Sequence, residues 1–205
     1  MAKVSSFKNM VLTLLVITFV SSALLAGVYE LTKDSIAAVR VQKINNGISG
    51  VLPEFDNNPS ENIYSKYVDG DTVYVYSATK DGKAVGSAIQ TFSNNGYGGK
   101  MVLMVGFLPN GDINNVVVIS HNETPGLGDK VDPKKNQKFS SQFLNKNPET
   151  FKLSVKKDGG DVDAITGTTV SSKAFTDAIA RAYKVYRDDI MKLEGEWDGA
   201  SGATN

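Results

Sequence analysis

The chain begins with a long apolar run. Residues 9–29 contain no charged side chain, and charged positions recur regularly only from residue 30 onward. A helix rises 1.5 Å per residue, so about 20 apolar residues cross the roughly 30 Å hydrocarbon core of a bilayer. The pattern predicts a single transmembrane helix within a first segment of residues 1–30.

A cleaved signal peptide is the alternative for this run. It requires a shorter apolar region that ends at a small-residue cleavage site, whereas this run continues past its candidate sites, so we favour a retained anchor. Lys3 and Lys8 precede the run, and charges of both signs follow it. The positive-inside rule therefore predicts a cytoplasmic N-terminus and an extracytoplasmic domain, held at the cell (inner) membrane.

The next segment has an amphipathic helical pattern. Apolar residues recur at near-helical intervals through residues 31–50, which predicts that the helix continues outward as a stalk. Proline and asparagine residues between 53 and 59 then indicate a loop. We assign residues 31–58 to the stalk and loop, residues 59–194 to a globular domain, and the Gly-rich residues 195–205 to a flexible tail.

Short runs of β-branched and aromatic residues follow the loop. The sequences Asp81-Gly82 and Pro109-Asn110-Gly111 separate neighbouring runs, as hairpin turns do. Consecutive hairpins build an antiparallel sheet. The predicted strands are residues 73–79, 84–92, 101–108 and 113–120.

Two later segments have helical periodicity. Residues 133–144 are weakly helical, and residues 171–193 carry a strong apolar stripe. The stripe consists of Ala174, Ala178, Ile179, Tyr183, Tyr186 and Ile190. The predicted fold class is therefore α+β, with one transmembrane helix followed by a domain in which helices pack on an antiparallel sheet.

Composition removes several classes of function. Basic and acidic residues number 22 each among 205 residues, and no basic cluster alternates with aromatic residues, so we expect no nucleic-acid partner. The chain has no cysteine, which excludes disulfides, thiol catalysis and Cys-ligated iron–sulfur clusters. His121 is the only histidine, and we expect no metal site. Redox chemistry would need an organic cofactor.

Five hydroxyl residues gather where the strong helix begins: Thr166, Thr168, Thr169, Ser171 and Ser172. The first turn of a helix has unpaired N–H groups and the positive end of the helix dipole, so it attracts anions. Gly167 lets a ligand approach the backbone closely, and the hydroxyls add donors. The cluster predicts a phosphate-binding site. A simple helix cap is the alternative, but it needs only one or two hydroxyls.

Residues 163–171, DAITGTTVS, resemble the flavinylation motif of the FMN-binding-domain family, Asp-x-x-(Ser/Thr)-Gly-Ala-Thr-x-(Ser/Thr). The last Thr of that motif carries FMN through a phosphoester, so the resemblance implies covalent FMN on Thr169. Thr168 replaces the usual Ala. The resemblance also implies a separate flavin transferase that uses FAD and Mg²⁺. Asp163 is either part of the motif that this enzyme recognises or a partner for N–H groups of the loop.

Residues 121–128, HNETPGLG, contain a second match. They resemble the ETPGLG loop of the same family, which lies against the flavin. The resemblance implies that Glu123 and Thr124 bond to the ring edge. Gly126, Leu127 and Gly128 would pack against the ring. Taken alone, the pattern would indicate only a Pro-Gly turn with one buried leucine.

Two neighbouring residues have open roles. Tyr97 lies in the Gly-rich sequence GYGG, which also resembles the family, and could stack on the flavin or on a partner subunit. His121 could influence protonation of the flavin or cap the end of a strand. No residue is predicted to be catalytic in its own right.

Within the family, the compact length and single anchor are most similar to the G subunits of Rnf-type ion-translocating ferredoxin:NAD oxidoreductases, and more distantly to C subunits of sodium-translocating NADH:quinone oxidoreductases. The resemblance implies an electron-transfer subunit that works with other membrane subunits and has no complete activity alone. The alternatives are a C-type subunit, an anchored module that binds a phosphorylated ligand reversibly, and a stand-alone flavin reductase.

The end of the chain repeats the motif. Residues 198–205, DGASGATN, carry Ala203 and Thr204 at the core positions, but neither a helix nor a final Ser/Thr follows. An electron carrier must hold its ring at a fixed place, and only the internal copy precedes a helix of the folded domain. We therefore predict Thr169 as the working site and Thr204 as a secondary acceptor candidate.

Overall fold

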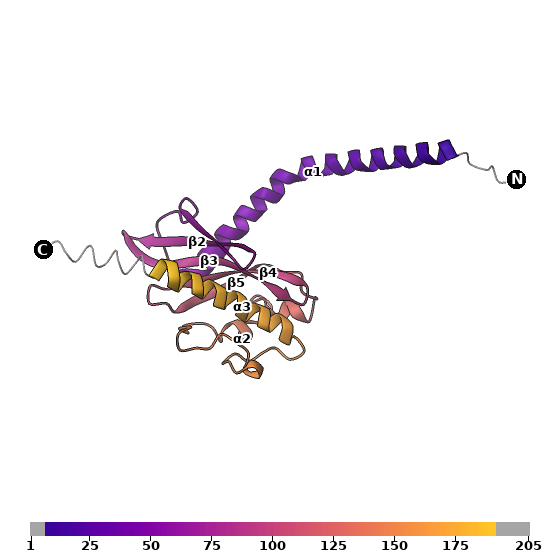
Figure 1. Ribbon diagram of the computed structural model, residues 1–205. Helices are drawn as coiled ribbons and strands as arrows, with labels where there is room; N and C mark the ends of the chain where they lie inside the picture. Colours follow the sequence, from indigo (N-terminus) through magenta and orange to yellow (C-terminus); the bar gives the residue numbers. More distant parts are fainter. Residues whose placement is uncertain (1–6, 192–205) are drawn as a thin grey trace. The chain divides into compact units, whose positions relative to one another are not determined.

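The computed structural model describes residues 7–191 of the chain (Figure 1). Its first element, α1 (Phe7–Val51), is a continuous helix of 45 residues. The predicted membrane helix and the predicted stalk are therefore one element. The predicted tail, residues 195–205, and the end of the last predicted helix lie outside the described residues.

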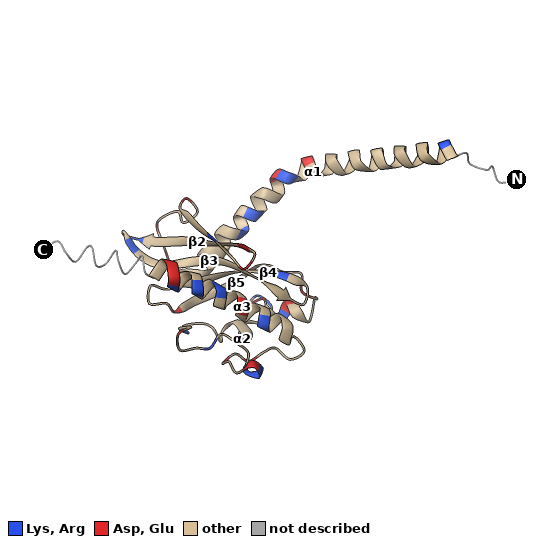
Figure 2. Cartoon of the chain, in the orientation of Figure 1, with Lys and Arg blue, Asp and Glu red and all other residues tan. Residues whose placement is uncertain are grey.

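The N-terminal part of α1 has the properties of a membrane span. Among the residues described, α1 is the one helix long and apolar enough to cross a bilayer. Figure 2 shows a long stretch of α1 with no blue or red residue, and in the sequence this stretch is the uncharged run of residues 9–29. Hydroxyls of Thr13 and Thr18 donate to carbonyls four residues earlier, which satisfies them inside the helix. This is consistent with a single-pass anchor.

The chain divides into two compact units, Met1–Lys43 and Ile44–Asn205. The second unit contains the last two turns of α1 and all the strands. The predicted boundaries at residues 30, 58 and 194 stay predictions.

The second unit is built on one antiparallel sheet with strands in chain order. The strands are β1 (Ile63–Val68), β2 (Asp71–Lys80), β3 (Lys83–Gly96), β4 (Gly99–Phe107) and β5 (Ile113–Ser120). The four predicted strands and the α+β class are confirmed. The strand β1 was not predicted, because it is an edge strand whose residues are mostly exposed and therefore lack a strong alternating pattern.

Each face of the sheet has its own core, because side chains alternate across a strand. On one face, Val75, Ile89 and Val105 pack with the apolar stripe of the C-terminal helix. On the other face, Tyr76, Ala88 and Met104 pack with Ile48 and Val51 of α1. The sheet is thus covered on one side by the end of α1 and on the other by the later helices.

The C-terminal helix α3 (Thr169–Val185) starts two residues before its predicted beginning and continues as a π-helical turn, η3 (Tyr186–Ile190). The predicted apolar stripe is buried throughout. The prediction for residues 133–144 is wrong in extent, because only α2 (Gln137–Ser140) is helical there. Phe139 and Phe143 are nevertheless buried and contact Phe175 of α3. The apolar spacing therefore arises from burial against α3, although the segment forms no long helix.

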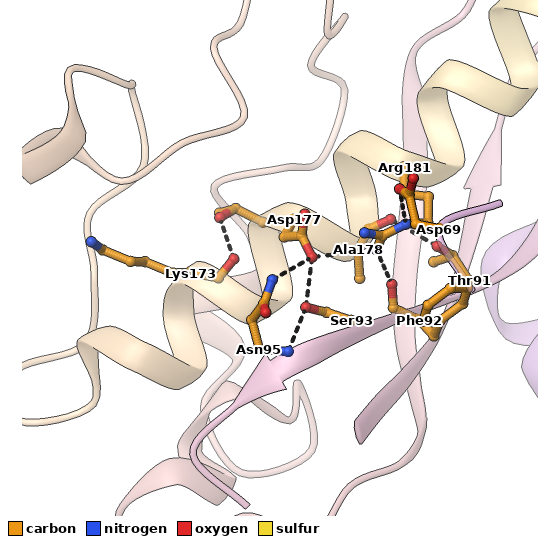
Figure 3. Close-up of polar contacts among 10 residues, drawn as sticks. Asp69, Thr91, Phe92, Ser93, Asn95, Lys173, Asp177, Ala178 and Arg181 are labelled. Carbon is orange, nitrogen blue, oxygen red and sulfur yellow. Dashed lines mark hydrogen bonds and ion pairs between the residues drawn. The ribbon is translucent and has the colours of Figure 1, made fainter. Parts of the chain in front are cut away.

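Polar contacts fix α3 on β3 (Figure 3). The Thr91 hydroxyl donates to the Ala178 carbonyl over 2.9 Å, and the Ser93 hydroxyl donates to the Asp177 carboxylate over 2.6 Å. Hydrogen bonds have directional geometry, so these contacts set the rotation of the helix about its axis. They therefore hold the middle of α3 against β3.

Candidate functional site

The start of α3 lies in an unusual cap. Gly167 has φ +77°, a left-handed conformation that favours glycine, and Thr168 follows as the N-cap residue. The Thr168 hydroxyl makes no cap bond and donates instead to the Leu127 carbonyl over 3.3 Å. Ser172 also points back, and its Oγ donates to the Thr168 carbonyl over 3.0 Å. The hydroxyls of Thr168 and Ser172 therefore do not act as a simple helix cap.

Thr169 is the first residue of α3 and is half-buried. The backbone N–H groups of the first helical turn have no partners within the helix, and the dipole of α3 adds partial positive charge. The N–H groups of Thr169, Val170 and Ser171 have no side-chain cap from Thr168, so the first turn of α3 offers donors suited to an anion beside Thr169.

The loop after β5 brings a buried carboxylate to the same place. Glu123 is 5% exposed, and its Oε2 accepts a 2.6 Å hydrogen bond from the Ser171 hydroxyl. Its Oε1 accepts the backbone N–H of Gly98, from the tip of the β3–β4 hairpin, over 3.3 Å. Glu123 therefore connects three segments that are distant in the sequence.

Glycines of two loops make room for this carboxylate. A Cβ on Gly128 would lie 2.3 Å from Glu123 Oε2, and one on Gly96 would lie 2.5 Å from Oε1. A Cβ on Gly98 would lie 1.9 Å from the Asn122 carbonyl oxygen. Main-chain atoms therefore exclude a side chain at Gly98 and at Gly96, where the Gly99 carbonyl oxygen would also lie 2.5 Å away, and a Cβ on Gly128 would displace the carboxylate of Glu123. Glu123 thus explains Gly96 of GYGG and the last glycine of PGLG, whereas Gly98 is required by the backbone of Asn122 and Gly99 has a positive φ of 90°.

These segments enclose an open pocket of about 560 Å³. This volume is within the usual range of small-molecule sites. Leu127 and Val170 offer apolar side chains that are 54% and 50% exposed, respectively. The pocket is lined by Tyr97, Glu123, Thr124, Leu127, Gly128, Gly167, Thr168, Thr169, Val170 and Ser171.

The pocket thus contains most of the residues that we predicted for the flavin site from the sequence, and they come from three separate segments. Val170 is the one lining residue that was not predicted from the sequence, because it occupies a variable position of the motif, where any residue type is allowed. Its place follows only from the helical geometry after Thr169. Leu127 is exposed, which differs from the buried leucine of a simple Pro-Gly turn.

Four of the predicted residues within the described part of the chain do not line the pocket: Asp163, Thr166, Gly126 and Ser172. The carboxylate of Asp163 is exposed and pairs with Lys156 Nζ over 2.8 Å. Its backbone is held by Gln142, whose Oε1 accepts the Asp163 N–H over 2.7 Å. Thr166 is exposed, and Gly126 is the turn residue of its loop with φ +78°.

Two titratable groups stabilise the loop. The Nδ1 atom of His121 accepts the N–H of Glu123 over 3.1 Å, which supports the strand-capping alternative for His121. Asp129 in η1 (Gly128–Val131) is buried. A hydrogen bond from Lys135 is the largest cause that lowers the pKa of Asp129, and the N–H of Gly126 adds to it. This ion pair holds the end of the ETPGLG loop.

Tyr97 and Thr204 are the remaining residues predicted for the site. Tyr97 is exposed at the tip of the β3–β4 hairpin and contributes to the pocket wall. Thr204 lies outside the described residues. Among residues 7–191, no group of three or more His, Asp or Glu side chains is placed to hold a metal ion.

The pocket lies within a segment that matches a known domain. Residues 96–184 match the family model of the FMN-binding domain. This range includes the ETPGLG loop and the first turn of α3, so all the lining residues fall inside it.

Relatives cover almost the whole chain. The chain is 32% identical over 202 residues to the G subunit of the ion-translocating oxidoreductase complex of Aliivibrio fischeri (strain MJ11), covering 92% of this chain and 96% of the relative. It is 35% identical to the protein of the same name from Haemophilus influenzae (strain PittEE), covering 82% and 84%. For Vibrio cholerae serotype O1 (strain M66-2), the identity is 31% and the coverage 93% and 95%.

Domain match and full-length similarity agree with the geometry of the pocket. The chain belongs to the family of G subunits of ion-translocating oxidoreductase complexes and contains an FMN-binding domain.

Proposed function

We propose that this chain is an electron-transfer subunit that carries FMN on Thr169 through a phosphoester bond. The observation that carries the proposal is the pocket itself, in which the hydroxyl of Thr169, the first turn of α3 and the ETPGLG loop meet. FMN would supply the redox chemistry, because it accepts and donates electrons reversibly.

The residues present fit each part of this cofactor. The uncapped N–H groups of the first turn of α3 and the helix dipole suit the phosphate. The exposed faces of Leu127 and Val170 suit a flat apolar ring, which would cover surface that is otherwise in water. Tyr97, at the hairpin tip, offers an aromatic face beside them.

Attachment would be the work of a flavin transferase that uses FAD and Mg²⁺. The Thr169 oxygen attacks the FMN phosphorus of FAD, the bond to the AMP phosphate breaks, AMP leaves, and the hydroxyl proton is released. Asp163 lies outside the pocket and faces solvent beside Lys156. This supports its role as a motif residue that the transferase recognises, in place of a role in holding the flavin.

The anchor and the relatives support a place in a complex. Relatives of 31–35% identity are named subunits of an ion-translocating oxidoreductase complex. We infer that this chain works with other membrane subunits of an Rnf-type complex that transfers electrons from ferredoxin to NAD. The charges around α1 support an extracytoplasmic FMN domain. The chain alone would have no complete enzymatic activity.

Mass spectrometry of the full-length chain, produced in its host, tests the proposal. We expect FMN on the peptide that contains Thr169, and flavin fluorescence that stays with the protein band after denaturation. T169A should lose that flavin. T168A is the comparison variant, because it restores the family's usual residue and keeps the acceptor hydroxyl of Thr169, while it removes the hydrogen bond to Leu127 at a cost of about 1 kcal/mol.

Other outcomes identify the alternatives. Flavin only on the peptide containing Thr204 would overturn the assignment of Thr169. Flavin or another phosphorylated compound that leaves the chain on denaturation would favour a reversible binding module. Full oxidoreductase activity of the isolated chain would contradict its role in a larger complex.

A further inference from the structure

The pocket contains a buried charge that the proposed attachment does not need. Glu123 is 5% exposed, and its two carboxylate oxygens are held by neutral donors, the Ser171 hydroxyl and the Gly98 N–H. Within the described part of the chain, no lysine or arginine forms an ion pair with it. Burying a carboxylate without an ion-pair partner costs free energy, so packing alone does not explain why Glu123 is present here.

Two features keep this side chain in one position. Both carboxylate oxygens are held by hydrogen bonds and lie close to Gly96 and Gly128, where an added Cβ would come within 2.5 Å of them. The N–H of Glu123 itself is held by His121 Nδ1, so the backbone is fixed as well. The charge therefore stays at one point of the pocket wall, one residue before Thr124 and opposite the start of α3.

We propose that Glu123 is a fixed negative charge that lowers the reduction potential of the flavin carried on Thr169. This inference rests on the proposed function. Each electron that enters a flavin adds negative charge unless a proton follows it. A carboxylate in the wall of the same pocket opposes that added charge, and the poor screening of a buried group makes the effect larger than at the surface.

The hydrogen-bond pattern makes charge and shape separable by mutation. In E123Q, the amide oxygen can accept the Gly98 N–H, and the amide NH₂ can donate to the Ser171 oxygen. This variant keeps the volume and the contacts but removes the charge. E123D keeps the charge but shortens the side chain. E54Q is the matched control, because it removes a carboxylate that is 85% exposed and lies outside the pocket.

The experiment compares full-length wild type, E123Q, E123D and E54Q at one fixed pH. Three quantities are measured on each purified chain: the unfolding midpoint, the fraction with flavin on the Thr169 peptide, and the flavin potential by spectroscopic redox titration. We expect E123Q to fold and to carry flavin as the wild type does, with a higher potential. E123D should shift the potential much less than E123Q, and E54Q should match the wild type.

Three results would overturn the proposal. They are an E123Q chain that carries flavin at the wild-type potential, an E123D chain whose potential shifts as far as that of E123Q, and an E123Q chain that fails to fold or to carry flavin. The last two results would make Glu123 a packing or loading residue. A wild-type chain without flavin on Thr169 would contradict the proposed function itself, before any variant is compared.

Discussion

Gly106 of β4 lies directly against the backbone of Val51, the last residue of α1. A Cβ built on Gly106 would lie 1.9 Å from the Val51 carbonyl oxygen and 2.7 Å from its carbonyl carbon. The neighbouring Asn114 and Asn115 side chains of β5 donate to the carbonyls of Val51 and Gly50 over 2.8 and 2.9 Å. The end of α1 is therefore fixed on the sheet by a close contact between two backbones and by two side-chain hydrogen bonds to its carbonyls.

G106A should separate these two backbones. The clash is with main-chain atoms, so we expect a loss of about 3 kcal/mol in the free energy of unfolding, at the upper end of overpacking effects. Chemical unfolding of the detergent-solubilised chain measures it. G50A is the control, because its Cβ would meet only Val117 at an ordinary 3.4 Å. Equal stability of G106A and wild type would contradict the contact.

Arg181 should be a major contributor to the packing of α3 on β3. Its guanidinium lies 4.7 Å from the Phe92 ring centre and donates to the Phe92 carbonyl and to Asp69, while its side chain is only 11% exposed. Figure 3 shows this group between β3 and α3. R181A should cost about 2–3 kcal/mol of unfolding free energy, since the carbonyl loses a charged donor.

Arg187 provides the comparison for Arg181 on the following turn of the same helical segment. It is half-exposed and pairs with its neighbour Asp188. R187A should change the unfolding free energy by less than about 0.5 kcal/mol, as exposed pairs do. Similar losses for R181A and R187A, measured by thermal unfolding, would show that the contacts of Arg181 are not specific.

The sequence predicted those parts of the fold that have a strong local pattern. The apolar run, the stripe of α3 and the central strands all appear because burial imposes a period on the residues. The strand β1 was missed although Asp69-Gly70 is a hairpin turn, with φ 49° and 90° at its two residues. An edge strand with exposed residues on both faces has no such period, so only its turn marked it.

For the site, the sequence selected residues but could not assign their contacts. Ser171 was expected to add a donor for an anion, yet its hydroxyl donates to Glu123. The glycines were expected to let a flat ring approach, yet Gly128 makes room for Glu123 and Gly126 forms a turn. The hydrogen bonds of Glu123 to Gly98 and Ser171 join residues 25 and 48 positions apart, and no local sequence pattern indicates such distant partners.

Removing Lys135 should destabilise the fold in a pH-dependent way. The ion pair with Lys135 is the main cause that lowers the pKa of Asp129 from its ordinary 3.8. A lowered folded-state pKa means that the pair stabilises the fold above pH 3.8 and that this contribution is lost as the pH falls through the lowered pKa. The unfolding temperature of K135M should therefore lie below that of the wild type at pH 7, and the difference should become smaller as the pH falls below 3.8.

Lys138 provides the matched control for Lys135. It is exposed on α2, only three positions along the chain, so K138M makes the same chemical change without removing a contact to Asp129. The unfolding temperature of K138M should equal that of the wild type at every pH. A K135M deficit that stays constant between pH 7 and pH 3 would mean that Asp129 does not titrate against this pair.

Val170 should shield the flavin from water without contributing to the stability of the fold. Its side chain is 50% exposed while it lines the pocket, so V170S removes little buried surface and should change the unfolding free energy by less than about 0.5 kcal/mol. A ring that lies against Val170 loses apolar cover in this variant. Quenching of flavin fluorescence by iodide should therefore become more efficient in V170S than in wild type.

The same exchange outside the pocket gives the comparison for V170S. Val39 of α1 is 51% exposed and is not among the residues that line the pocket, so V39S matches V170S in chemistry and in exposure. We expect iodide quenching in V39S to equal that of the wild type. If V170S and V39S quench alike, the ring lies elsewhere in the pocket, and Leu127 with Tyr97 would have to supply its apolar contacts.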